Sequence, residues 1–88
     1  MTNVEIYTKD YCPYCKSAKA LLNRRGIKFT EYDVLVDAEK YEEMLRRSNG
    51  GRTVPQIFFD DVLIGGSDDL HSLDRSGQLA ILLAEAAA

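Results

Sequence analysis

The sequence is poor in features that would place it in several protein classes. It has two cysteines, one histidine and no tryptophan among 88 residues. Two cysteines are too few for the disulfide framework of a small secreted domain. They also cannot by themselves complete a tetrahedral zinc site, so no metal site is expected.

An excess of positive charge and long apolar runs are missing as well. The net charge is −3, with acidic and basic residues interspersed. This balance provides neither a basic stripe for nucleic acid nor a polybasic membrane anchor. No apolar run approaches the roughly 20 residues of a membrane span, and no signal-peptide pattern opens the chain. We therefore expect one small cytoplasmic domain over residues 1–88, a monomer without nucleic-acid or membrane partners.

The two cysteines lie three residues apart, in the stretch Tyr11-Cys12-Pro13-Tyr14-Cys15. A β-rich run precedes this stretch and a helical pattern follows it, so a C-x-x-C stands at a strand-to-helix junction. Pro13 lacks an N–H and suits the first helical position, which makes Cys12 the N-cap. We expect the Cys12 sulfur to accept hydrogen bonds from the N–H groups of Tyr14 and Cys15.

This position favours an ionised first sulfur. The positive end of the helix dipole stabilises a thiolate, and Lys9, Lys16 and Lys19 add positive potential nearby. Cys15 follows one turn later on the same helix face, so the two sulfurs can meet. We interpret Cys12 as the attacking thiol and Cys15 as the more buried, resolving thiol. The alternative, a pair of inert buried thiols, does not explain the proline at the first helical position.

The periodicity of the chain predicts an α/β domain of order β-α-β-α-β-β-α. The expected strands cover residues 3–8, 27–34, 56–59 and 62–64, with a two-residue turn at 60–61. The expected helices cover residues 13–25, a segment capped by Asp37 that ends at 49–51, and a segment capped by Ser67. A last amphipathic segment follows Gly77. A mixed four-stranded sheet with helices on both faces results, and with the C-x-x-C it resembles the thioredoxin fold.

Three motifs at these separations resemble those of one branch of that fold, the glutaredoxin family. They are Cys12-Pro13-Tyr14-Cys15, the segment Thr53-Val54-Pro55, and the run Gly65-Gly66-Ser67-Asp68-Asp69. Thioredoxins themselves usually carry Trp-Cys-Gly-Pro-Cys, and this chain has no tryptophan. The resemblance covers nearly the whole chain and is to the small dithiol (Cys-Pro-Tyr-Cys) type of bacterial glutaredoxin.

The resemblance implies a glutathione-dependent thiol–disulfide oxidoreductase. Protein–glutathione mixed disulfides would be reduced through Cys12 alone, and protein disulfides through Cys12 and Cys15 together. Glutathione would be the reducing co-substrate, with no permanently bound cofactor. The residues expected to contact it are Lys9, Tyr14, Thr53, Val54, Pro55, Gly66, Ser67 and Asp68.

The resemblance implies a specific role in binding glutathione for several of these residues. The backbone of Val54, before a cis Pro55, would pair with the cysteinyl part of the tripeptide. Lys9 would meet the glycyl carboxylate. Amides at the start of the third helix suit the γ-glutamyl carboxylate, with a contribution from Ser67, and Asp68 suits the ammonium group. Whether Arg46 or Arg52 assists Lys9 is left open.

Two other functions are compatible with the same motifs. One is a hydrogen donor reduced by thioredoxin reductase, although such proteins typically lack the glutathione-binding residues. The other is a binding module in which two subunits share an iron–sulfur cluster through Cys12 and glutathione. Pro13 and the second cysteine weigh against it, since the specialised carriers usually have Cys-Gly-Phe-Ser. Family members often serve ribonucleotide reductase, and no residue here identifies that enzyme as a client.

Overall fold

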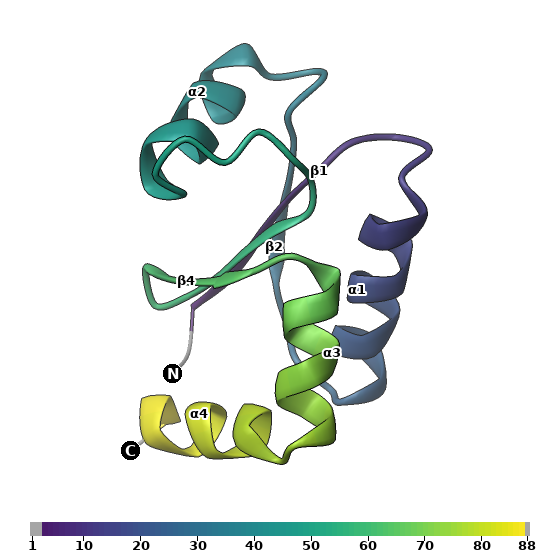
Figure 1. Ribbon diagram of the computed structural model, residues 1–88, viewed down its shortest axis with the longest axis vertical. Helices are drawn as coiled ribbons and strands as arrows, with labels where there is room; N and C mark the ends of the chain where they lie inside the picture. The colour runs from purple at the N-terminus through teal and green to yellow at the C-terminus, as the bar shows by residue number, and fades with distance from the viewer. Residues whose placement is uncertain (1–2, 88) are drawn as a thin grey trace.

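The computed structural model describes residues 3–87, which form a four-stranded sheet and four helices (Figure 1). The elements are β1 (Val4–Thr8), α1 (Pro13–Arg24), β2 (Thr30–Asp33), α2 (Ala38–Arg47), β3 (Gln56–Phe59), β4 (Val62–Gly65), α3 (Ser67–Arg75) and α4 (Gln78–Ala87). The strand order is β2-β1-β3-β4; β1 and β2 are parallel, and the other two pairs are antiparallel. The predicted mixed sheet and α/β class are therefore confirmed. Across residues 3–87, no helix is long and apolar enough to cross a membrane.

Helices cover both faces of the sheet, as predicted. On one face, α1, α3 and α4 bury a core with β1 and β3 that includes Ile6, Leu21, Ile57 and Leu70. Figure 1 shows α1 and α3 on this side and α2 apart from them. On the other face, α2 covers a smaller cluster of Tyr7, Val34, Met44 and Phe58. Because side chains alternate along a strand, β1 supplies Ile6 to one core and Tyr7 to the other.

Three predicted boundaries are corrected by the structure. The second strand begins at Thr30 rather than residue 27, because the parallel register pairs Glu5 with Thr30; Ile27 is buried in the core from the preceding loop. Ser67 is the first residue of α3 and Gly66 is its N-cap, since the Gly66 carbonyl accepts the Leu70 N–H at 3.1 Å. The segment after Gly77 forms a separate helix, so the element order has an additional helix at its end.

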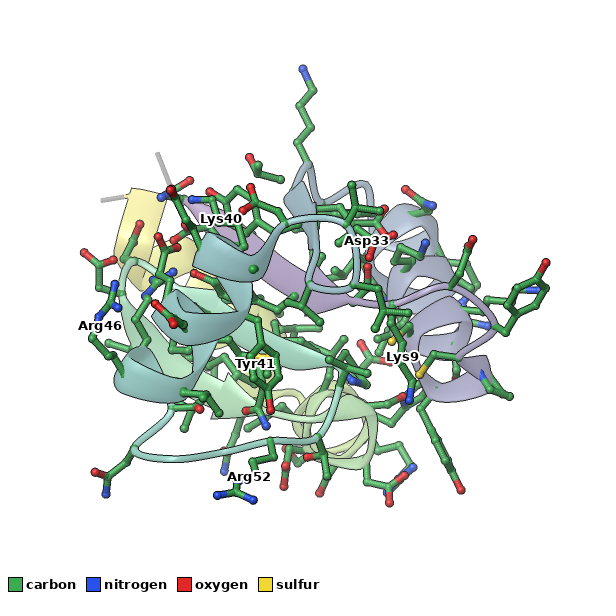
Figure 2. The ribbon with its side chains drawn as sticks, turned by 90° about the horizontal axis from the view of Figure 1, so that it is seen from above. Lys9, Asp33, Lys40, Tyr41, Arg46 and Arg52 are labelled. Carbon is green, nitrogen blue, oxygen red and sulfur yellow. The ribbon has the colours of Figure 1, made fainter. Side chains whose placement is uncertain are left out.

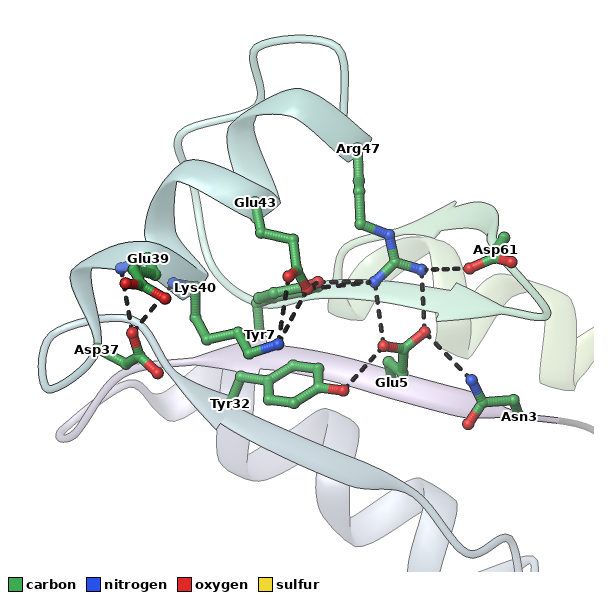
Figure 3. Close-up of polar contacts among 10 residues, drawn as sticks. All are labelled: Asn3, Glu5, Tyr7, Tyr32, Asp37, Glu39, Lys40, Glu43, Arg47 and Asp61. Atoms are coloured by element: carbon green, nitrogen blue, oxygen red, sulfur yellow. Dashed lines mark hydrogen bonds and ion pairs between the residues drawn. The ribbon is translucent and has the colours of Figure 1, made fainter.

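A polar network fastens α2 to the sheet (Figure 3). Arg47 on α2 donates to the Glu5 carboxylate at 2.9 and 3.2 Å and to the Tyr7 hydroxyl oxygen at 2.6 Å. The Tyr7 hydroxyl donates to Glu43, and the Tyr32 hydroxyl donates to Glu5 at 2.9 Å. The hydrogen bond from Tyr7 holds the pKa of Glu43 below its usual value, and burial raises the pKa of Tyr7. Thus α2 is held by charge in addition to apolar packing.

We expect Arg47→Met to destabilise the fold. The substitution would lower the free energy of unfolding by about 2–3 kcal/mol, because the buried Glu5 carboxylate would lose its cationic partner. Arg46→Met is the matched control, since Arg46 lies one residue away and is exposed; it should cost about 0.5 kcal/mol or less. Urea unfolding measures both values. Equal losses in the two variants would show that the network does not hold α2.

Candidate active site

The first cysteine is placed by the start of α1. Cys12 is the N-cap, with extended backbone at φ −103° and ψ 106°, and Pro13 is the first helical residue. The Cys15 N–H donates to the Cys12 sulfur across 3.3 Å. The predicted cap is therefore confirmed, with one difference: the sulfur bonds the amide of Cys15 and not that of Tyr14. An N-cap acceptor reaches the second or third amide of its helix, and here it sits over the third.

The second cysteine is enclosed by the fold. Cys15 is 2% exposed and Cys12 is 5% exposed. Burial raises the pKa of the Cys15 thiol to about 12, and its contact with Cys12 acts in the same direction. Cys15 is therefore a thiol at neutral pH, because its pKa lies well above 7. This state suits a resolving residue, which must not compete with Cys12 for the first attack.

The segment before β3 lies directly against the first sulfur. The peptide bond between Val54 and Pro55 is cis, as the resemblance implied. The Cys12 thiol donates to the Val54 carbonyl oxygen across 3.7 Å. The Gln56 side-chain amide donates to the Thr53 carbonyl at 3.0 Å and to its hydroxyl at 3.3 Å, which fixes the segment. The backbone of residues 53–55 is thus held beside Cys12, although it lies about 40 residues further along the chain.

A groove of about 330 Å³ lies between Tyr14, the segment around Pro55 and the start of α3. Its lining contains these residues: Tyr14, Thr53, Val54, Pro55, Gln56, Gly65, Gly66, Ser67, Asp68 and Asp69. Asp69 closes the first turn of α3, because its Oδ2 accepts the Gly66 N–H at 3.0 Å. Gly65 has φ +120°, and a Cβ there would collide with the Asp69 carboxylate. The structure thus brings together every predicted contact residue except Lys9 in one groove.

Lys9 lines a second groove, of about 470 Å³, together with Cys12. Tyr14, Thr53 and Val54 border both grooves. Figure 2 shows the three cations on different segments: Lys9 in the loop after β1, Arg52 in the loop before β3, and Arg46 on α2. Of the two arginines, Arg52 lines the groove, and Arg46 is exposed.

The sequence reasoning missed the apolar residues of the second groove. Tyr11, Leu35 and Tyr41 line it together with Cys12. Tyr41, on α2, is half-buried at the groove. Leu35 is 69% exposed and Tyr11 is 92% exposed, in loops where periodicity carries no information. Of these residues, Tyr11 alone has a signal in the sequence, which is its position next to the cysteine motif.

The charges of the two grooves differ, and this difference limits what can bind. The first groove contains Asp68, Asp69 and the amino end of a helix, which suits a group carrying both an ammonium and a carboxylate. The second contains the cations Lys9 and Arg52, which suit a carboxylate. With Cys12 in the second groove, and Tyr14, Thr53 and Val54 bordering both grooves, the arrangement fits thiol–disulfide exchange on an extended ligand charged at both ends.

Comparisons with known proteins give one consistent result. A family model described as glutaredoxin matches residues 4–64. Glutaredoxin 3 of Escherichia coli (strain K12) is 57% identical over 83 residues, covering 94% of this chain and 99% of the relative. The solution structure of glutaredoxin from Brucella melitensis is 48% identical, with a TM-score of 0.80 over 94% of this chain and 89% of that one. A buckwheat glutaredoxin–glutathione complex is 27% identical, with a TM-score of 0.85 over 99% and 81%.

Proposed function

Because the chain belongs to the glutaredoxin family and is a glutathione-dependent thiol–disulfide oxidoreductase, we propose that Cys12 is its nucleophile and Cys15 its resolving thiol. The observation that carries this assignment is the position of the Cys12 sulfur. It accepts the Cys15 N–H at the start of α1, and Cys12 lines the second groove, which shares Tyr14, Thr53 and Val54 with the first. The thiolate is the form of a cysteine that attacks a disulfide.

The first reaction needs Cys12 alone. Its thiolate attacks the glutathionyl sulfur of a protein–glutathione mixed disulfide, and the bond between the two sulfurs of the substrate breaks. The client leaves as a thiolate and takes up a proton, while glutathione stays bonded to Cys12. A second glutathione thiolate then attacks the bound glutathionyl sulfur. Oxidised glutathione leaves, and the Cys12 thiolate is restored.

The second reaction needs both cysteines. The Cys12 thiolate attacks a protein disulfide and forms a mixed disulfide with the client. Cys15 then loses its proton and attacks the Cys12 sulfur, which releases the reduced client and leaves a Cys12–Cys15 disulfide. Two glutathione molecules reduce that disulfide and leave as oxidised glutathione. The separation of one helical turn supports this step, because it brings the two sulfurs together.

Glutathione fits across the two grooves in one direction. Its γ-glutamyl end, with an ammonium and a carboxylate, suits Asp68 and the amides at the start of α3. Its cysteinyl part would pair with the Val54 backbone beside Cys12. Its glycyl carboxylate would meet Lys9, with Arg52 on the same groove. Thr53, Pro55, Gly66 and Tyr14 would form the walls, and Ser67 would contribute a polar group.

We expect Lys9→Met to weaken this placement measurably. The KM for a glutathionylated peptide should rise about 3- to 5-fold at low salt, because one exposed charge pair contributes up to about 1 kcal/mol. The increase should shrink as salt is added, since exposed charges are screened. Steady-state kinetics at fixed glutathione measures it. Lys28→Met is the matched control, an exposed lysine in the loop at the opposite end of α1.

The reaction also indicates the setting in which the protein works. Its electrons come from glutathione, which is maintained reduced in the cytosol, so we place the enzyme in the cytoplasm. Its clients are proteins with an accessible disulfide or a glutathionylated cysteine.

An unchanged KM in the Lys9→Met variant, or an equal rise in the Lys28→Met variant, would overturn the placement of the glycyl carboxylate and leave the roles of the cysteines intact.

A further inference from the structure

The single histidine of the chain joins the helix that carries the thiols to the helix that borders the first groove. His71 lies on α3, and its Nε2 is 3.2 Å from the hydroxyl oxygen of Ser17 on α1. Its Nδ1 is 2.8 Å from the carbonyl oxygen of Ser67 and 3.3 Å from the Ser67 hydroxyl oxygen. Ser67 is 5% exposed and lines the first groove. The imidazole therefore lies behind a wall of that groove.

These contacts determine where the imidazole carries its proton. A carbonyl oxygen only accepts hydrogen bonds, so the 2.8 Å contact with Ser67 requires a proton on Nδ1. In the neutral ring Nε2 is then an acceptor, and the Ser17 hydroxyl donates to it. In the protonated ring Nδ1 still carries its proton, so the contact with Ser67 is the same in both states.

The proton on Nδ1 also determines what the Ser67 hydroxyl can do. A hydroxyl has one proton to donate and two lone pairs. Toward His71 the Ser67 hydroxyl can only accept, because Nδ1 is already a donor. Its own proton is therefore left for another acceptor. Since Ser67 lines the first groove, a carboxylate bound there is such an acceptor.

We propose that His71 is a positioning residue for glutathione: it orients the Ser67 hydroxyl as a donor to the γ-glutamyl carboxylate. This inference rests on the proposed placement of glutathione in the first groove. Packing between α1 and α3 does not depend on the imidazole, because Ala18, Leu21, Leu22 and Leu70 are fully buried in one core. His71 itself is only partly buried. Its loss should therefore change binding of the glutathionyl group more than stability.

The test uses a series of substitutions in the full chain. His71→Ala removes both contacts of the ring. His71→Asn keeps an N–H donor near the position of Nδ1 and so can still donate to the Ser67 carbonyl, while it loses the reach to Ser17. Ser72→Ala is the matched control, an exposed neighbour on the same helix. Thermal unfolding of each variant checks that the fold is retained.

Kinetics with two substrates distinguish a loss of glutathione binding from a general loss of activity. For a glutathionylated peptide, His71→Ala should raise KM about 3- to 10-fold with kcat within about twofold of wild type, the pattern of lost uniform binding. His71→Asn and Ser72→Ala should stay within about twofold. For a peptide disulfide without glutathione, assayed as reduction by the prereduced protein, no variant should differ from wild type. In a Ser67→Ala background, adding His71→Ala should change KM less than about twofold, because the two residues act through one contact.

The outcomes distinguish this inference from the function on which it rests. S-methylglutathione cannot react, so it reports binding alone when it is titrated into the wild-type protein and followed by amide NMR. If the Ser67 and Asp68 amides do not shift, the placement of glutathione itself is wrong. If they shift while His71→Ala leaves KM unchanged, or while His71→Asn behaves like His71→Ala, the role of His71 is overturned. A full effect of His71→Ala in the Ser67→Ala background overturns it as well.

Discussion

Replacing Cys12 by serine should abolish both reactions, with the rate falling to the uncatalysed background, a loss of about 1,000-fold or more. A hydroxyl at this position cannot form a disulfide with glutathione or with a client, so neither route can begin. The measurement is reduction of a glutathionylated peptide and of a peptide disulfide by glutathione, followed by coupling the oxidised glutathione to glutathione reductase and NADPH.

The same substitution is a controlled one because the fold should tolerate it. Serine is among the preferred N-cap residues, so its hydroxyl oxygen can accept the Cys15 N–H that the sulfur accepts now. The melting temperature should therefore stay within a few degrees of wild type, since a change of 1 kcal/mol in stability shifts it by about 4–8 °C. Lost activity in a folded protein would identify the sulfur as the cause. Turnover within tenfold of wild type would rule Cys12 out as the nucleophile.

Replacing Cys15 by serine should separate the two reactions. Removal of glutathione from a peptide should continue within about threefold of wild type, because that route uses only Cys12. Reduction of a peptide disulfide by the prereduced protein, without glutathione, should fall about 100-fold or more, because no second thiol is present to release the client. The hydrogen bond to the Cys12 sulfur comes from the backbone N–H of Cys15, so the substitution leaves it in place.

The intermediate makes this second prediction visible directly. With Cys15 replaced, the client should remain bonded to Cys12, and intact-protein mass spectrometry should detect one added client per chain. Wild type under the same conditions should release the client and lose two hydrogens. Release of reduced client by the Cys15→Ser variant would contradict the resolving role. Loss of glutathione removal in that variant would contradict the route through Cys12 alone.

Short-range features were predictable from the sequence because few neighbouring residues determine them. Pro13 at the first helical position made Cys12 the cap, and Asp37 accepts the amides of Glu39 and Lys40 as its position predicted. The turn at Asp60 and Asp61 has two positive φ angles and joins adjacent strands, again as predicted. One error, the start of the second strand, occurred where a boundary depends on a distant partner. The second strand begins at the residue where its pairing with β1 begins, and its own residues do not determine that start.

The candidate site shows the same division. The resemblance named the residues that would hold glutathione, while their arrangement in two grooves of different charge depends on the packing of three distant segments. Tyr41 and Leu35 joined the second groove without any local signal, because their place depends on how α2 and the preceding loop lie over the sheet. The contact of His71 with Ser17 joins residues 54 positions apart, and no sequence pattern predicts it.

By itself, the sequence determined the chemistry of this protein: a thiol pair at a helix start, because capping depends on residues within one turn. It also determined the class of fold, because hydrophobic periodicity encodes which faces must be buried. Only the tertiary structure decided what surrounds the reactive sulfur, because that environment arises where segments far apart in the chain are brought together by burying their apolar faces.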